Sequence, residues 1–403
     1  MKTIEEKSRI YKKRSLQERW AMDTESYKNG AKRLVSTPQC TTCENHIKGN
    51  ALHCKCYDSE RKPKYVMFPE KECPSYHNHV PMVLDIRNEK ESRIYGGLFG
   101  FCVGDAMGVP VEFSTREERK RNPVEGMWAY GTHHQPFGTW SDDTSLTLCL
   151  IDAINKGYSV NRLAQNFVDF YEKSSFTPWG EIFDIGNATR DALIQMCAGK
   201  NPVECGGAEE NHNGNGSLMR VLPLAFYGYK LDDDDLIKMV EEVSSLTHRA
   251  KRSELACIFY VQFVIQLLKN EKEHALEKTV DFVKKNCRIS YADELQYFER
   301  ILDKQILSLP EEQVKSTGYV VDTLEAAVWT FFHTAGYREA ILKAVNLGGD
   351  TDTIAAVAGG MAGAYYGFCD IPDNWIQNIV KKEELYRIFQ DFGNRCGGVC
   401  ELH

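Results

Sequence analysis

The sequence predicts an all-α domain over residues 91–395 that follows a small cysteine-rich module. Stretches such as "LTLCLIDAINKGYSVNRLAQNFVDFYEK" and "TLEAAVWTFFHTAGYREAILKAVN" repeat apolar residues with the helical period, and strand-like alternation is scarce. No βαβ rhythm appears along the chain, and the composition changes from polar and cysteine-rich to apolar and periodic near residue 90. A single helical domain with an N-terminal extension is therefore expected.

The extension divides into two parts, and a short tail ends the chain. Residues 1–35 are basic and predicted to form a helical arm, residues 36–90 hold the cysteine-rich module, and residues 396–403 are a C-terminal tail. The basic arm suggests an acidic partner, although a solvated helix face would have the same composition.

Five of the fourteen cysteines crowd into residues 40–73, and a structural metal would explain the clustering. Cys40 and Cys43 form a C-x2-C pair, and Cys54 and Cys73 complete our preferred tetrahedral Zn²⁺ site. A zinc-ribbon-like module of this size has little core of its own, so a bound ion would favour its folding. The alternatives are unligated thiols, or a histidine in place of one sulfur.

Charge and hydropathy argue against several classes of protein. A net charge of -8, from 49 basic and 57 acidic residues, argues against a general nucleic-acid binder. The charged N-terminus has no apolar signal-peptide core, and the longest apolar run, residues 354–368, is too short to span a membrane. A cytoplasmic protein with reduced thiols and no membrane partner is expected.

Two helix starts carry more oxygen than a helix cap requires. Ser141, Asp142, Asp143 and Thr144 precede one apolar helix, and residues 350–353, "DTDT", precede another. One acceptor satisfies an N-cap, so a second carboxylate in each place needs another reason. The two starts could meet and bind divalent cations such as Mg²⁺ or Mn²⁺, or each could be a doubly capped helix. Spacing alone leaves both interpretations open.

Two further acids lie where the stretch "GGLFGFCVGDAMGVPVEF" ends its helix. For Asp105 we favour a buried structural acid that is hydrogen-bonded to neighbouring backbone. Glu112 follows the turn directly, and its role is left open.

A donor-rich loop, "NGNGS" at residues 213–217, runs into a helix that starts at Leu218. Backbone N–H groups in such a position can hold a phosphate, although most Gly/Asn loops are only turns. His248 lies in a polar turn between helices, where a surface or capping role is more common than ligand binding.

In order, these stretches resemble the motif series of the ADP-ribosylglycohydrolase family. The series reads "GDAMGVPVE", "WSDDTSLT", "FDIGNATRDAL", "GNGSLMRVLPLAF", "LTHRAKRS" and "GGDTDTIAAVAGGMAGAYYG", and it covers about residues 93–370. It is most similar to the branch typified by dinitrogenase reductase-activating glycohydrolase. The resemblance implies an orthogonal helical bundle with two Mg²⁺ or Mn²⁺ ions in a central cleft.

The resemblance also implies roles for single residues. The implied ligands are Ser141, Asp142 and Asp143 for one ion and Asp350, Asp352 and Thr353 for the other, with Asp352 bridging. The family usually has Thr in place of Ser141, and the hydroxyl is kept. The residues implied to hold the diphosphate and adjacent ribose are Asn215, Gly216, Ser217 and His248, and Met219 and Asp105 are further substrate-binding candidates. Glu112 is implied to approach the metal site and Asp184 to lie near the scissile bond.

The implied activity is metal-dependent hydrolysis of the bond between ADP-ribose and a modified side chain, with arginine on a protein as the expected substrate. Asp142 or Asp143 is expected to do acid–base work near the ions, and Asp184 to face the guanidinium. The alternatives are a non-catalytic ADP-ribose-binding module and a hydrolase of another ADP-ribosylated or ribosyl N-glycoside.

Overall fold

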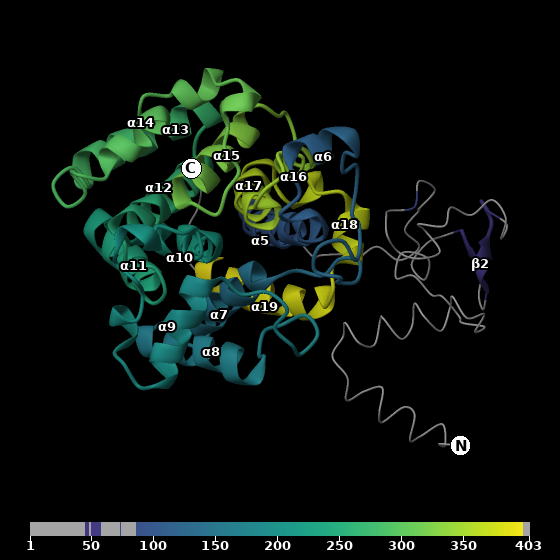
Figure 1. The fold of residues 1–403 in the computed structure, drawn as a ribbon, viewed down its shortest axis with the longest axis horizontal. Helices are drawn as coiled ribbons and strands as arrows, with labels where there is room; N and C mark the ends of the chain where they lie inside the picture. Colours follow the sequence, from purple (N-terminus) through teal and green to yellow (C-terminus); the bar gives the residue numbers. More distant parts are fainter. Residues whose placement is uncertain (1–44, 48–49, 58–72, 74–85, 398–403) are drawn as a thin grey trace.

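The computed structural model describes residues 45–47, 50–57, 73 and 86–397 (Figure 1). A short antiparallel pair, β1 (His46–Ile47) and β2 (Asn50–Cys54), places Ile47 opposite Asn50. Of the predicted zinc ligands, Cys54 and Cys73 lie within the described residues. Cys40, Cys43 and the basic arm lie outside them, so the zinc site and the arm stay predictions.

Every regular element that the structure describes from residue 86 onward is a helix, which confirms the predicted all-helical domain. The α-helices are α5 (Glu89–Gly108), α6 (Arg116–Arg121), α7 (Asp142–Asn155), α8 (Val160–Lys173), α9 (Asn187–Cys197), α10 (Pro223–Tyr227), α11 (Asp233–Ser245), α12 (Lys251–Leu267), α13 (Lys272–Asn286), α14 (Glu299–Leu302), α15 (Val320–Phe332), α16 (Tyr337–Val345), α17 (Thr351–Tyr366), α18 (Asp373–Asn378) and α19 (Lys382–Gly397). The 3-10 turns are η1 (Val109–Val111), η2 (Pro202–Glu204), η3 (Glu210–His212), η4 (Leu218–Arg220), η5 (Gly228–Lys230), η6 (Leu295–Phe298), η7 (Gln305–Ser308), η8 (Glu311–Gln313) and η9 (Phe368–Asp370).

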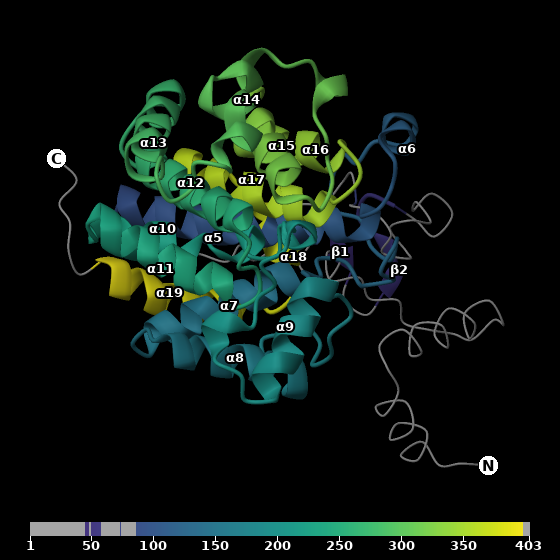
Figure 2. The same cartoon turned by 60° about the vertical axis from the view of Figure 1, so that its left-hand side comes forward.

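Helices α5 and α17 form the centre of the bundle and lie side by side in both views (Figures 1 and 2). Helices α7, α8 and α9 lie on one side of this pair, and α12, α13, α15 and α16 lie on the other. The apolar run of α17 is buried from Thr351 to Ala364, as expected for a central helix.

Glycines let the two central helices touch backbone to backbone. Four of the five glycines of α5, Gly96, Gly100, Gly104 and Gly108, recur every fourth residue, so these four lie on one face of the helix. A Cβ added to Gly96, Gly100 or Gly104 would come within 3 Å of a backbone carbonyl of α17, closer than real Cβ atoms come to such atoms. Gly108 lies in the same way against the backbone of Asp352. The helices are antiparallel, so the end of α5 lies beside the start of α17.

Among the described helices, α5 with η1 is the one that is long and apolar enough to cross a membrane. Its apolar window is completely buried inside the bundle, which is the environment of a core helix.

Candidate active site

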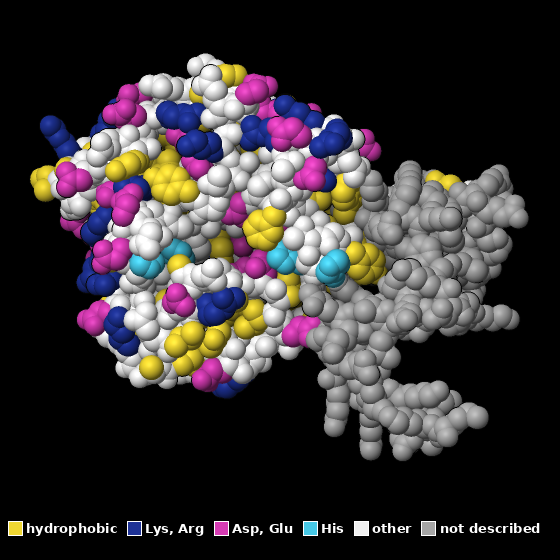
Figure 3. Space-filling view, viewed as in Figure 1, with side chains coloured by type: hydrophobic (Ala, Val, Ile, Leu, Met, Phe, Trp, Pro, Cys, Tyr) yellow, Lys and Arg dark blue, Asp and Glu magenta, His cyan; other side chains and the backbone are white. Residues whose placement is uncertain are grey.

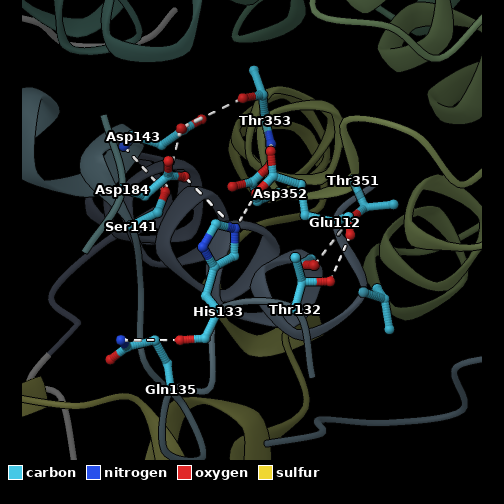
Figure 4. A network of polar contacts seen from close by, with 12 residues as sticks. Glu112, Thr132, His133, Gln135, Ser141, Asp143, Asp184, Thr351, Asp352 and Thr353 are labelled. Carbon is cyan, nitrogen blue, oxygen red and sulfur yellow. Dashed lines mark hydrogen bonds and ion pairs between the residues drawn. The ribbon is translucent and has the colours of Figure 1, made fainter. Parts of the chain in front are cut away.

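The two oxygen-rich helix starts meet beside the end of α5. Thr353 Oγ1 at the start of α17 lies 3.4 Å from Asp143 Oδ2 at the start of α7. Glu112, directly after η1, brings a carboxylate oxygen within 4.8 Å of those of Asp350 and Asp352. Figure 4 shows these side chains converging from separate segments, and in Figure 3 acidic side chains are visible at the bottom of a hollow in the face shown. The structure thus brings the sequence-distant clusters together.

Capping does not account for the carboxylates. Ser141 is the N-cap of α7, and its hydroxyl accepts a hydrogen bond from the backbone N–H of Asp143. Asp350 is the N-cap residue of α17, but its side chain makes no capping hydrogen bond and instead accepts from Asn215 Nδ2 at 2.7 Å. Asp143 Oδ1 is buried and has no hydrogen-bond partner among the described residues. A buried carboxylate oxygen that accepts no hydrogen bond is suited to bind a cation.

Electrostatics also favour a cation among these acids. Burial raises the pKa values of Asp142, Asp143 and Asp352 well above the ordinary value, and neighbouring carboxylates raise them further. So many buried carboxylates repel one another when they are ionised, and divalent cations would remove that repulsion. Carboxylate and hydroxyl oxygens are the ligands that Mg²⁺ and Mn²⁺ prefer, so the residues present fit such ions.

The glycine turn at residues 348–349 holds Glu112 and Asp350 close together. Gly348 and Gly349 both have a left-handed φ, +72° and +75°, which glycine adopts without strain. This turn lets Gly349 exchange backbone hydrogen bonds of 2.7 Å with Phe113 and Ser114. The segment that carries Glu112 is thereby fastened to the residue that precedes Asp350.

Asp105 positions α7 and does not face the cleft. Its carboxylate is fully buried and accepts hydrogen bonds from the backbone N–H groups of Ser141 and Thr144 and from Thr144 Oγ1 at 2.6 Å. Burial raises the pKa of Asp105 to about 6, although these hydrogen bonds oppose the shift. The geometry matches the structural interpretation that we favoured, and it does not support placing Asp105 among the substrate-binding residues.

The hydrogen bonds to Asp105 predict how much stability the protein loses when one donor is removed. Thr144→Val should lower the free energy of unfolding by about 1.5–3 kcal/mol, because a buried carboxylate loses a hydrogen bond. Thr330→Val is the matched control, since Thr330 Oγ1 is buried without a hydrogen-bond partner among the described residues. Urea unfolding of both variants measures the difference. Equal stabilities would show that the Thr144 hydroxyl does not support Asp105.

Only part of the predicted substrate loop, residues 213–217, contacts the acid cluster. Asn215 Nδ2 donates to Asp350 Oδ2 and also to Thr323 Oγ1 at 2.9 Å. The ring of His248 lies against Gly216, where an added Cβ would meet its edge within 3 Å. Burial, together with the charge of Arg220, lowers the pKa of His248 to about 3, so the imidazole is neutral at pH 7.

Ser217 and Met219 make their contacts inside the core. Ser217 is fully buried and accepts a hydrogen bond from Ser244 Oγ, and Met219 packs in the hydrophobic core. The helix expected after the loop is only the 3-10 turn η4, which is too short to present a helix N-terminus to a phosphate. The structure therefore brings Asn215 to the acid cluster, and the assignment of Gly216, Ser217 and Met219 to substrate binding stays a prediction.

His133 belongs to the cluster and was missed by the sequence analysis. Its Nε2 atom contacts Glu112 Oε2 and lies 3.9 Å from Asp184 Oδ2 (Figure 4). Burial lowers the pKa of His133, but the contact with Glu112 and the charge of Asp184 outweigh burial and raise it above the ordinary value. Burial in turn raises the pKa of Glu112 to about 7, against the opposing effect of His133. Only a pair of adjacent histidines in the sequence hinted at this residue.

Comparison with known proteins agrees with the geometry. The family model for ADP-ribosylglycohydrolase matches residues 87–401. The chain is 33% identical to ADP-ribosylarginine hydrolase Tri1 of Pseudomonas putida (strain GB-1), over 77% of this chain and 80% of the relative. It is 28% identical to the ADP-ribosyl-[dinitrogen reductase] glycohydrolase of Rhodospirillum rubrum, over 72% of this chain and 92% of the relative.

A solved structure shares the fold. It is described as an ADP-ribosylglycohydrolase-related protein complex, and it is 30% identical to this chain with a TM-score of 0.65. The similarity covers 76% of this chain and 99% of that one. The helical bundle, the ordered motifs and the extent of the match lead to one conclusion: the chain belongs to the ADP-ribosylglycohydrolase family, whose members hydrolyse glycosidic bonds.

Proposed function

We propose that this protein removes ADP-ribose from modified arginine side chains of proteins, with two divalent ions bound in the acid cluster. The observation that carries the proposal is the convergence of Glu112, Asp350 and Asp352 beside Asp143, whose Oδ1 atom has no hydrogen-bond partner among the described residues. A relative that is 33% identical is named ADP-ribosylarginine hydrolase, which supports arginine as the linkage.

The ligand assignment follows the two helix starts. Ser141, Asp142 and Asp143 would hold one Mg²⁺ or Mn²⁺, and Asp350, Asp352 and Thr353 would hold the other. When bound, such ions bind and orient hydroxyl groups of the ribose and polarise a nearby water.

The protein's own carboxylates would stabilise the reacting sugar. Breaking the bond between C1″ of the ribose and the guanidine nitrogen develops positive, oxocarbenium-like charge on the ribose. Buried carboxylates near C1″ favour that charge more than they favour the neutral substrate, which lowers the barrier. Asp142 or Asp143 would carry the acid–base work at this end of the site.

Asp184 would receive the arginine end of the substrate. The Asp184 side chain is 24% exposed, against 7% for Glu112, so it is the more accessible acid of the group around His133. A guanidinium is a planar cation that pairs well with a carboxylate. The departing guanidine also needs a proton, and His133, whose Nε2 lies 3.9 Å from Asp184 Oδ2, would supply it.

A panel of linkages tests the proposal. The full chain should release ADP-ribose from an arginine-modified protein in Mg²⁺ or Mn²⁺ and stop when EDTA is added. Release from a serine-linked substrate should be at least about tenfold slower, because the site would lack its guanidinium partner. Thin-layer or mass-spectrometric detection of free ADP-ribose measures both rates.

Two other outcomes would change the proposed function. ADP-ribose binding without release from any substrate would replace the hydrolase with a non-catalytic binding module. Faster release from another linkage would keep the hydrolase and reject arginine.

A further inference from the structure

A second cavity lies outside the acid cluster, between α6, the loop that follows it and α16. Its volume is about 660 Å³, within the range of small-molecule pockets. Four cations line it, Arg119, Lys120, Arg338 and Lys343, against two acids, Glu125 and Glu311. In Figure 3, Lys and Arg side chains gather over α6 and α16 at the upper right of the view, with acidic side chains between them. We call this the Arg119 cavity.

Arg119 is buried and forms no ion pair with another described residue. The residue is only 8% exposed, and neither Nε nor Nη1 has a hydrogen-bond partner among the described residues. Its guanidinium carbon lies 5.2 Å from the centre of the Trp128 ring, which offers a cation–π contact but no acceptor. The neighbouring acid, Glu118, is hydrogen-bonded to Thr115 in the capping box of α6. A buried guanidinium in this state is costly unless an anion completes it.

The other three cations are only partly neutralised. Lys120 Nζ forms a 3.8 Å ion pair with Glu311. Arg338 donates to the backbone carbonyl of Glu125 at 2.9 Å, and Lys343 lies over the Trp329 ring. In the part of the chain that the structure describes, neither Arg338 nor Lys343 forms an ion pair. The cavity therefore has an excess of positive charge that is available to a ligand.

We propose that the Arg119 cavity binds a phosphorylated small molecule, with a phosphate group at Arg119 and the remaining charge on Lys120, Arg338 and Lys343. Phosphate oxygens accept several hydrogen bonds at once, and the fork of guanidinium donors fits them. The apolar side chains of Pro123, Val124 and Leu342 line the same cavity and would contact the uncharged part of the ligand. The inference is independent of the activity proposed for the acid cluster.

Inorganic pyrophosphate is the probe. Isothermal titration calorimetry of the full chain, in buffer freed of metal ions with a chelating resin, should show one binding site that weakens as salt is added. Arg119→Met should weaken binding at least about tenfold, because it removes the buried cation but keeps an unbranched apolar chain. Arg288→Met is the matched control, since Arg288 is exposed and does not line the cavity.

A second variant keeps the test decisive if Arg119→Met does not fold. Lys120 and Arg338 are exposed, so Lys120→Ala/Arg338→Ala should fold and should also weaken pyrophosphate binding at least about tenfold. Equal affinity in Arg119→Met would place the bound pyrophosphate elsewhere and overturn the proposal. Failure of the wild-type chain to bind pyrophosphate would overturn it too. Binding of poly-glutamate in its place would point to an acidic protein partner.

Discussion

Asp352→Asn is expected to lower kcat by at least about 100-fold while the protein stays folded, because the variant loses a carboxylate ligand of the proposed ions. Asp352 is 2% exposed, and its Oδ1 accepts the backbone N–H of Thr353 at 2.9 Å. Asparagine keeps an oxygen for that hydrogen bond and is nearly the same size. The substitution therefore tests charge with little change of shape.

The same variant should respond to metal ions in a way that separates binding from folding. Without ions, Asp352 is a buried acid. Burial raises its pKa, and the charges of Glu112, Asp143 and Asp350 raise it further. Removing one of these mutually repelling charges should leave the thermal midpoint of the metal-free protein unchanged or higher. Adding MnCl₂ should raise the midpoint of the wild type much more than that of Asp352→Asn.

The control is Asp152→Asn, at the far end of α7. Asp152 is hydrogen-bonded to Lys156 and Asn166 and lies outside the acid cluster. This variant should keep both its turnover and its response to Mn²⁺. Wild-type turnover in Asp352→Asn, or an undiminished response of its midpoint to Mn²⁺, would refute the assignment of Asp352 as a metal ligand.

Gly104→Ala should destabilise the protein by about 3 kcal/mol, at the upper end of the usual cost of overpacking. The added methyl group would meet the backbone carbonyl of Ala355 in α17, and a backbone atom cannot move aside as a side chain can. The two central helices would have to separate. Because their ends carry Glu112 and Asp352, separation should also weaken metal binding.

Gly393→Ala is the matched helical substitution. Gly393 lies inside α19, and the nearest atom to an added Cβ is Tyr95 Oη at 3.5 Å, an ordinary contact. Alanine is the better helix former by about 0.8–1 kcal/mol, so this variant should be as stable as the wild type or more stable. Thermal or urea unfolding of both variants compares them. If Gly104→Ala were as stable as Gly393→Ala, the close approach of α5 and α17 would be wrong.

The helices and their starts could be predicted because their signals are local. Apolar periodicity predicted the bundle, and the run after Asp352 predicted a buried helix. The excess of carboxylates over caps was also visible in the sequence, and the Asp350 side chain makes no capping hydrogen bond at the start of α17. The reading of Asp105 as a structural acid rested on its place at a tight turn.

The parts of the site that depend on distant contacts could not be predicted from local patterns. Nothing near Asp143 in the sequence indicates that it lies beside Thr353, and their proximity follows from packing across the bundle. His133 comes from an irregular loop without a motif. Ser217 and Met219 lie in a motif that suggested the cleft, but burial against Ser244 and the core decides where their side chains point.

The backbone contact between α5 and α17 has a consequence for biosynthesis. Thr351 donates to the carbonyl of Gly108 across 243 positions of sequence, so the first helix of the bundle leaves the ribosome long before its partner. At ordinary rates of translation this interval lasts roughly 12–50 s. During that time α5 is an apolar, glycine-rich segment of membrane-spanning length that lacks its main partner, α17. The nascent chain should therefore need a chaperone until α17 emerges, and a ribosome-bound chain that ends before Thr351 should bind trigger factor or a similar holdase more tightly than one that includes α17.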